Sequence, residues 1–394
     1  MKNLETLIQE LCPNGVEFVK LGDVLDYEQP TKYIVKCKDY QNEGMPVLTA
    51  GQTFILGYTD ETNGIFEASK ENPVIIFDDF TTSFHWVDFN FKVKSSAMKM
   101  LRVLSEREVS FRFVYYAMKC IKYQTLEHSR QWISKYSQIE IPLPPIEVQT
   151  EIVRILDKFT SLEAELEAEL DCRKRQYEYY RDKLLSFENV GGQEVEWKKM
   201  SEVGTFIRGN GLQKKDFTES GVGCIHYGQI YTKFNTFTDK TLTYCSENVA
   251  RKLTPVHPGD LIIACTSENV EDVCKTVAWL GKEDIVTGGH ACVFSHHENP
   301  KYIAYLLQTE NFFQQKKKYA RGVKVIDIKV ADLQKITLPI PSLEEQHRIV
   351  SILDRFESLT TSLQSGLPAE IVARRQQYEH YRDKLLTFKR KGAA

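Results

Sequence analysis

Two stretches of the chain carry apolar residues at alternating spacings of three and four. This periodicity places the apolar side chains on one face of an α-helix, and it is typical of a coiled-coil seam. We therefore predict two long amphipathic helices. The predicted seam residues are Ile152, Leu156, Phe159, Leu162, Tyr177, Tyr180 and Leu184 in the first helix, and Ile349, Leu353, Phe356, Leu359, Tyr378, Tyr381 and Leu385 in the second.

Both helices have start signals, and the first also has a stop signal. Two prolines at 144–145 precede the first helix, and Ser342 with Glu345 three residues later forms a capping-box pattern ahead of the second. Two glycines at 191–192 are expected to end the first helix, because glycine readily adopts the left-handed conformation of helix ends. The two helical segments are accordingly predicted over 146–190 and 342–394.

The two helical stretches are copies of each other. IVRILDKF at 152–159 recurs as IVSILDRF at 349–356, 197 residues later. QYEYYRDKLLSF at 176–187 recurs as QYEHYRDKLLTF at 377–388, 201 residues later, with ten of twelve positions identical. The four extra residues of the second copy fall around 365–370. There Gly366 and Pro368 predict a kink or break, because a proline inside a helix removes a hydrogen bond.

A weaker repeat indicates that the whole chain is a tandem duplication. GVEFVKLGDV starting at Gly15 resembles EVEWKKMSEV starting at Glu194, and Val16 corresponds to Val195, 179 residues later. The offset grows from 179 to 197 before the helices, so the second variable region is the longer one by 18 residues. The repeated segments, which we call the frame, thus flank two regions of dissimilar sequence, residues 1–145 and 191–341, which we call the inserts.

Both inserts are predicted to mix helices and strands. VIIF at 74–77 and LIIAC at 261–265 have the continuous apolar character of buried strands. FRFVYYAMKCI at 111–121 and YIAYLLQTENFF at 302–313 have helical character instead. The predicted fold class is α+β, with two α/β domains in a tandem pseudo-two-fold repeat, separated by two long antiparallel coiled-coil helices.

The order of the segments explains why the helices should be antiparallel. The first helix leaves domain one and arrives at domain two, and the second leaves domain two. A helix over 146–187 would be roughly 60 Å long, less than two turns of duplex DNA at about 34–36 Å each. This suits two half-sites read in inverted orientation. A homodimerising coiled coil or ordinary core helices would show the same periodicity, but neither accounts for a kept frame with divergent inserts.

The composition indicates a folded protein. The 394 residues are 42% hydrophobic, enough for a core in each of two domains, and no apolar run approaches the roughly 18 residues of a membrane span. Nine cysteines occur without a Cys-x-x-Cys pair, so we expect reduced, mostly buried thiols, no metal site and a cytoplasmic protein. A net charge of −3 argues against indiscriminate nucleic-acid binding, so DNA contacts must come from local basic patches.

The clearest basic patch is KKKYARGVK at 316–324, with five positive charges in nine residues. Such a cluster suits phosphate neutralisation, and Arg321 could instead contact guanine, although a solvated helix end would look the same for each lysine. Arg130, Gln131 and Lys135 occupy a similar place before the first helix. The candidate DNA contacts are Lys92, Lys94, Lys99, Arg102, Arg130, Gln131, Lys135, Arg208, Lys214, Lys215, Tyr227, Gln229, Lys316, Lys317, Lys318, Arg321 and Lys324, with Gln52, Thr53 and His85 as further polar candidates.

Motifs of a self-contained enzyme are not found in the sequence. Pro73 and Pro300 follow Asn without the second proline of an Asn-Pro-Pro-aromatic methyltransferase loop, and no G-x-x-x-x-G-K-[ST] phosphate loop occurs. The acidic pair Asp78 and Asp79 lacks a nearby Glu-x-Lys. These absences argue against a single-chain nuclease or methyltransferase. Two noncatalytic hypotheses remain, a DNA-binding subunit and a coiled-coil adaptor that never contacts DNA.

These motifs resemble a known family, the DNA specificity subunits of type I restriction-modification systems. The matching elements are LCPNGVEFVKLGDV at 11–24, IPLPPIEVQTEIVRILDKF at 141–159, LPIPSLEEQHRIVSILDRF at 338–356, SGLPAEI at 365–371 and the two QYE segments. The resemblance covers the full chain.

The resemblance implies two target recognition domains, each reading half of an asymmetric bipartite sequence in double-stranded DNA. The helices would set the spacing and dock two modification subunits, which would methylate adenines with S-adenosylmethionine after the base leaves the stack. Restriction/translocase subunits would add ATP- and Mg-dependent translocation and cleavage. No cofactor and no catalytic residue would belong to this chain, which is expected in the cytoplasm of a bacterium or archaeon.

Overall fold

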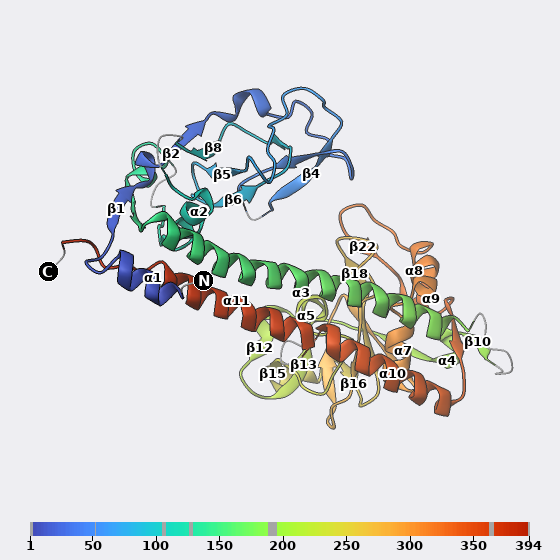
Figure 1. Cartoon of the computed structure of the whole chain (residues 1–394). Coiled ribbons are helices and arrows are strands. Elements are labelled where there is room, and N and C mark those ends of the chain that lie inside the picture. The colour runs from blue at the N-terminus through green and yellow to red at the C-terminus, as the bar shows by residue number, and fades with distance from the viewer. Residues whose placement is uncertain are drawn as a thin grey trace. The chain divides into compact units, whose positions relative to one another are not determined.

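The structure is a computed structural model that describes residues 3–51, 53–104, 108–125, 129–187, 195–361 and 366–392. It divides into two compact units. Unit 1 comprises Met1–Leu166 and Ile371–Ala394, and unit 2 comprises Glu167–Glu370 (Figure 1). Each unit therefore contains one of the predicted globular domains together with parts of the long helices.

Unit 1 is built from three small sheets. An antiparallel sheet has the order β2 (Leu25–Glu28), β8 (Met98–Val103), β5 (Val74–Asp78), β6 (Phe84–Val87). A second sheet has the order β4 (Ile55–Thr59), β3 (Met45–Leu48), β7 (Lys92–Val93), and β1 (Glu17–Lys20) pairs with β9 (Glu140–Leu143). The short helices of unit 1 are α1 (Leu4–Leu11), α2 (Phe111–Lys119) and the 3-10 turns η1 (Leu21–Asp23), η2 (Pro30–Tyr33) and η3 (Tyr136–Gln138).

Unit 2 contains two five-stranded sheets and two strand pairs. The first sheet has the order β11 (Gly204–Arg208), β21 (Ala291–His296), β17 (Leu261–Ala264), β19 (Thr276–Trp279), β14 (Phe237–Thr238). The second has the order β12 (Phe217–Thr218), β15 (Thr243–Cys245), β13 (Val222–Ile225), β20 (Ile285–Thr287), β16 (Thr254–Val256). The strand pairs are β10 (Glu196–Lys199) with β23 (Thr337–Ile340) and β18 (Thr266–Ser267) with β22 (Ile326–Asp327). The helices are α4 (Met200–Val203), η4 (Lys214–Asp216), α5 (Tyr227–Thr232), α6 (Glu247–Ala250), α7 (Pro300–Leu306), α8 (Glu310–Lys317) and α9 (Val330–Leu333).

The two units share one strand topology. The order β2-β8-β5-β6 in unit 1 corresponds to β11-β21-β17-β19 in unit 2, and β4-β3-β7 corresponds to β15-β13-β20. In both three-stranded groups one outer strand pairs antiparallel and the other parallel with the middle one. Strands β12, β14 and β16 are additions in unit 2. The duplication therefore extends through the inserts, and dissimilar sequences form the same ladders.

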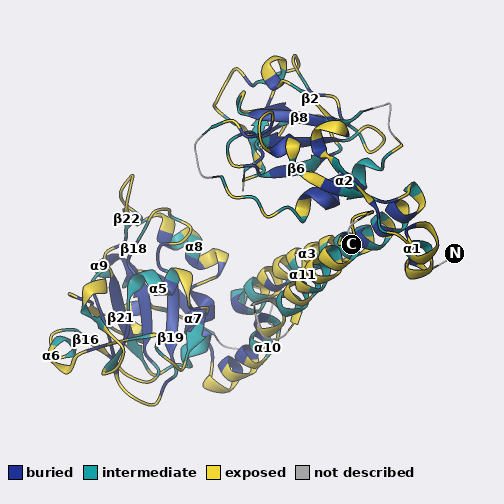
Figure 2. Ribbon diagram, turned by 90° about the vertical axis from the view of Figure 1, so that its left-hand side faces the viewer, coloured by how far each residue is buried: buried dark blue, intermediate teal, exposed yellow. Residues whose placement is uncertain are grey.

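The strongest local patterns formed the predicted elements. Strands β5 and β17 contain the two apolar runs and are almost wholly buried (Figure 2). Helix α2 occupies the first predicted helix. The second is interrupted, because the Thr309 hydroxyl accepts a hydrogen bond from the Phe312 N–H and so caps the start of α8. The cysteines are all unpaired thiols, and most are buried, as expected.

The first long helix, α3, extends over Ile146–Ser186, 41 residues. It begins directly after the two prolines, but it ends earlier than predicted. Phe187 has a left-handed φ of 53° and so takes the conformation expected of a terminating glycine. The glycines at 191–192 lie outside the described residues. The C-terminal end of α3 is therefore set by Phe187.

The second predicted helix is divided in two. Helix α10 (Leu343–Thr361) begins with the Ser342 hydroxyl accepting from the Glu345 N–H, and α11 (Gly366–Leu385) follows. Residues 362–365 lie outside the described residues. Gly366 has φ of +75°, and Pro368 falls in the first turn of α11, where a proline has no intrahelical hydrogen bond to lose. Among the described residues no helix is long and apolar enough to cross a membrane.

Within each unit the long helices pack on each other and on the globular core. In unit 1 the rings of Phe159 and Tyr381 stack at 5.5 Å, and Glu163 pairs with Arg375 at 2.7 Å, so α3 and α11 run antiparallel. In unit 2 Tyr180 stacks on Phe356 at 6.2 Å. The buried residues Ile152 and Leu156 belong to the core of unit 1, and Ile349, Leu353 and Tyr177 to that of unit 2.

Two predicted seam positions are wrong. Leu162 is 45% exposed and Leu359 is 56% exposed. At the level of Leu162 the neighbouring Glu163 faces α11 instead, with its side chain only 19% exposed in the ion pair with Arg375. Leu359 lies in the last turn of α10, two residues before that helix ends. The predicted seam is therefore apolar near the globular domains and contains an ion pair farther along α3.

Candidate nucleic-acid interface

Matching polar contacts attach each long helix to its own globular domain. In unit 1 the Asp157 carboxylate accepts from Arg112 at 2.9 Å and from the Tyr116 hydroxyl at 2.5 Å. In unit 2 Asp354 accepts from Lys301 at 2.6 Å and from the Tyr305 hydroxyl at 2.7 Å. We call these two groups the clasps. Both tyrosine hydroxyls are buried beside carboxylates, which raises their pKa and keeps them protonated donors at neutral pH.

A buried glutamine repeats the same connection about two turns earlier in each helix. Gln149 accepts from the Ser110 N–H at 2.9 Å and donates to the Pro144 carbonyl at 2.7 Å. Gln346 accepts from the Asn299 N–H at 2.9 Å and donates to the Pro341 carbonyl at 3.0 Å. Each domain is thus connected to its helix through the same groups, at equivalent places in the repeat.

Four of the predicted DNA contacts are wrong because their side chains are buried. Lys92 pairs with Glu61 at 3.0 Å and donates to backbone carbonyls of the same loop. Lys99 is fully buried in the central strand β8, 3.5 Å from Asp79. Gln131 donates to the Ser129 carbonyl. The Lys316 ammonium donates to the carbonyls of Glu271 and Val273. These groups fix loops and do not face solvent.

In unit 1 two of the remaining candidates, Arg130 and Lys135, flank a turn fixed by Asp79. The Asp79 carboxylate accepts from the Trp132 N–H at 2.8 Å and from the Gln131 N–H at 3.1 Å. Arg130 is 52% exposed with its guanidinium 3.8 Å from Asp79, and Lys135 is exposed on the other side of the turn. Lys94 is also exposed, whereas Arg102 is half-buried over the ring of Phe66. Thr53 is exposed, His85 lies 2.9 Å from the Gly51 carbonyl, and Gln52 lies outside the described residues.

In unit 2 the exposed cations follow α8. Lys317 and Lys318 end this helix, and Arg321 and Lys324 lie in the loop behind it. Arg208, Lys214 and Lys215 are exposed elsewhere, whereas Gln229 is held in the N-terminal cap of α5 by the His226 N–H. Tyr227 lines a cavity of about 540 Å³ together with Tyr231, His290, Ser267 and Lys275.

The basic segment of unit 1, residues 130–135, and that of unit 2, residues 316–324, are not at equivalent positions in the fold. The Gln131 N–H donates to the Asp79 carbonyl at 2.8 Å, and the Ile328 N–H donates to the Cys265 carbonyl at 3.0 Å at the matching end of strand β17. Gln131 and Ile328 are therefore the equivalent anchors. Arg130 and Lys135 flank the anchor of unit 1, whereas Arg321 and Lys324 both precede that of unit 2. The frame is common to the units, and the exposed basic groups differ.

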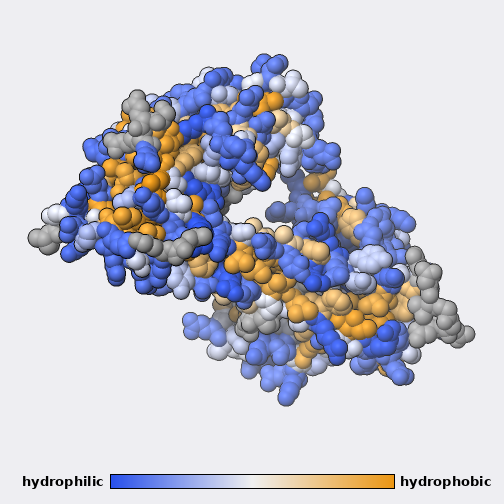
Figure 3. Space-filling model, viewed as in Figure 1, coloured by the Kyte–Doolittle hydropathy of each residue, from blue (hydrophilic) through white to orange (hydrophobic). Residues whose placement is uncertain are grey.

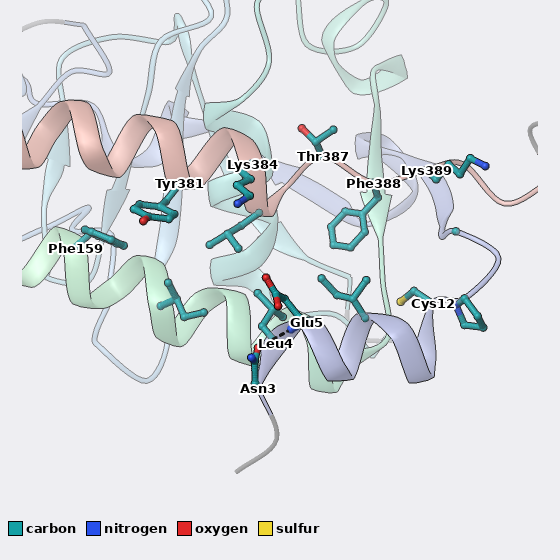
Figure 4. Close-up of a pocket in the computed structure, with 15 residues that line it drawn as sticks. Asn3, Leu4, Glu5, Cys12, Phe159, Tyr381, Lys384, Thr387, Phe388 and Lys389 are labelled. Atoms are coloured by element: carbon teal, nitrogen blue, oxygen red, sulfur yellow. Dashed lines mark hydrogen bonds between the residues drawn. The ribbon is translucent and has the colours of Figure 1, made fainter.

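The long helices also expose apolar groups. Leu162, Leu343, Leu359 and Val372 are between 44% and 56% exposed, and Figure 3 shows apolar side chains gathered over these helices. In unit 1 a pocket of about 580 Å³ lies between α1, α3 and the end of α11. Phe159, Tyr381 and Phe388 line it, with Cys12 at its edge (Figure 4).

The positioning roles of Asp79 and the clasp carboxylates were not predicted from the sequence. Asp157 and Asp354 are the Asp shared by LDKF and LDRF, but the helical pattern there indicates only the apolar residues around them. Val323, 95% exposed in a basic loop, gives no signal in the sequence beyond its charged neighbours.

The model of the type I restriction modification DNA specificity domain matches residues 13–171 and 193–373, and the chain belongs to this family. It is 43% identical over 403 residues to the type I restriction enzyme EcoR124I/EcoR124II specificity subunit of Escherichia coli, covering 98% of this chain and 97% of that one. It is 30% identical over 410 residues to a putative type I restriction enzyme specificity subunit of Haemophilus influenzae, covering 98% and 100%. A solved structure on complex assembly and conformational transition of the type I R-M system has the same fold, with a TM-score of 0.55, 17% identity and coverage of 95% and 98%.

Proposed function

We propose that this chain is the DNA sequence-specificity subunit of a type I restriction-modification complex, in which each unit reads one half of an asymmetric bipartite target. One observation carries the proposal: the two units share strand order and clasps but differ in their exposed basic loops. A common frame with different loops is what two half-sites of different sequence require. The proposed contacts are Lys94, Arg102, Arg130, Lys135, Arg208, Lys214, Lys215, Tyr227, Gln229, Lys317, Lys318, Arg321 and Lys324.

The chain supplies specificity, and its partners supply chemistry. Two modification subunits dock on the long helices and methylate adenines with S-adenosylmethionine, and restriction/translocase subunits use ATP and Mg. The half-exposed apolar residues of α3, α10 and α11 support docking, because such groups are enriched at protein interfaces. The helices set the unread spacer, and the 41-residue α3 is long enough to span roughly 60 Å.

Methylation mapping tests this function. The chain is coexpressed with its modification subunits, and methylated adenines are mapped across the genome by single-molecule sequencing. We expect a split, asymmetric motif with a fixed gap, in which exchange of one globular domain changes one side only. A stable complex without any methylation motif would favour a coiled-coil adaptor, and methylation by the chain alone would establish a self-contained enzyme.

A further inference from the structure

A closed loop of unit 2, over residues 321–327, follows α8 and ends with strand β22. Arg321 and Asp327 exchange backbone hydrogen bonds of 3.1 and 2.8 Å, and β22 then pairs with β18. Gly322 has φ of +115°, and a Cβ at this position would come within 2.0 Å of the Val325 carbonyl oxygen. The 321–327 loop therefore has a fixed base and a bend that only glycine accommodates.

The tip of this loop is apolar. Val323 is 95% exposed and Val325 is 59% exposed. Isolated apolar side chains are common on protein surfaces. Here, however, two valines lie within three residues on a loop whose backbone is fixed, and Figure 2 shows the loop projecting from the body of unit 2. The hydrogen-bonded base limits the conformational entropy that the loop loses when a partner buries its tip.

Cations flank the apolar tip. Arg321 and Lys324 are exposed on either side of Val323, and Lys317 and Lys318 end the preceding helix. The nearby carboxylate of Asp332 lies 3.7 Å from Arg321, but it is also bound by Lys335 at 2.7 Å. Positive side chains thus stand directly beside Val323, whereas the adjoining cavity lined by Val325 also contains Glu268 and Asp272.

An apolar tip between cations is complementary to a groove of duplex DNA. The cations match the phosphates on the rims, and a branched aliphatic side chain matches apolar base edges such as the thymine methyl group, or a base step that it can wedge open. An apolar protein partner would give no reason for the cations. Val325 also lines the aromatic cavity that contains Tyr227 and His290, so the loop and the cavity form one continuous surface.

We propose that Val323 is a specificity-determining residue, which enters a DNA groove and contacts base edges of the half-site read by unit 2, while Arg321 and Lys324 contact the flanking phosphates. This inference rests on the proposed DNA recognition and adds the residue that does the reading.

The test compares Val323→Ala with Leu242→Ala in the complex with the modification subunits. Leu242 is also aliphatic and 57% exposed, but it lies next to β15, away from β22 in Figure 1. DNA binding is measured by fluorescence anisotropy. The probes are a duplex that contains the motif found by methylation mapping and a set of duplexes that each carry one base-pair change in that motif. We expect Val323→Ala to weaken binding about 4- to 15-fold, as for the loss of one or two buried methyl groups, and to relax the preference at one or two adjacent positions of one half-site. Leu242→Ala should match the wild type.

Two results would overturn the inference while leaving the function intact. One is a Val323→Ala complex that binds every duplex as the wild type does. The other is uniform weakening on all duplexes, which would place Val323 against the backbone or against a partner subunit. If the wild-type complex discriminated no duplex, the proposed function itself would fail. Thermal unfolding of both variants should be unchanged, because both side chains are exposed.

Discussion

The buried pair of Asp79 and Lys99 gives the sharpest test of the structure. Both side chains are at most 1% exposed, their charged atoms are 3.5 Å apart, and Asp79 also holds the backbone of the turn that carries Arg130. Asp79→Asn keeps an oxygen that accepts from the Trp132 N–H but removes the charge. Lys99 is then left as an unpaired buried cation, which costs about 3–5 kcal/mol of unfolding free energy.

A second substitution isolates the cause. Adding Lys99→Met to Asp79→Asn removes the stranded cation and keeps a similar volume, so most of the lost stability should return. Urea unfolding followed by tryptophan fluorescence measures both variants. With a slope near ~2 kcal/mol per M, the single variant should shift the unit 1 transition by about 2 M, while the unit 2 transition stays in place.

The pH dependence of the single variant has a definite sign. Burial lowers the pKa of Lys99, and the nearby Asp79 carboxylate raises it again, so loss of Asp79 lowers it further. The unfolded chain then binds more protons than the folded one between the lowered pKa and the ordinary value of 10.5, and stability rises with pH in that window. A double variant no more stable than Asp79→Asn, or a single variant whose deficit is independent of pH, would refute the assignment of the loss to a stranded charge.

Three further outcomes follow from the structure. Asp354→Asn should lower the free energy of unfolding of unit 2 by about 1–3 kcal/mol, because it weakens the contacts with Lys301 and Tyr305, and it should speed hydrogen exchange in α7. Unchanged exchange in α7 would show that the clasp does not stabilise this helix. Leu156→Asp should cost several kcal/mol in unit 1, because it places an unpaired charge in a fully buried site, and wild-type stability with normal methylation would contradict that packing. Replacing Lys317 and Lys318 by Ala should lower the salt dependence of DNA binding by about 2 in log–log slope, whereas Lys316→Met should leave it unchanged; equal slopes for all would show that neither exposed lysine contacts phosphate.

Local patterns in the sequence predicted the long helices, the strands β5 and β17, and helix α2, because each is fixed by periodicity or by a continuous apolar run. The error at Lys99 had a physical origin. Basic and apolar residues alternate loosely over 91–102, which is the pattern of a half-exposed strand. However, β8 is paired on both sides by β2 and β5, and its Lys99 pairs with an aspartate distant in sequence. Contacts of this kind depend on the tertiary fold. The same holds for the interface between α3 and α11, in which Glu163 and not Leu162 faces α11.

The place of the added strands in unit 2 has a consequence for how such a domain can change. Strands β12, β14 and β16 all lie at outer edges of their sheets. An edge can accept a new neighbour without breaking an existing ladder. Strand β14 also adds to the clasp, because the Lys301 ammonium lies 3.7 Å from the centroid of the Phe237 ring. Strands added at sheet edges can thus change the exposed surface of the domain while the contacts of Asp354 with Lys301 and Tyr305 are kept.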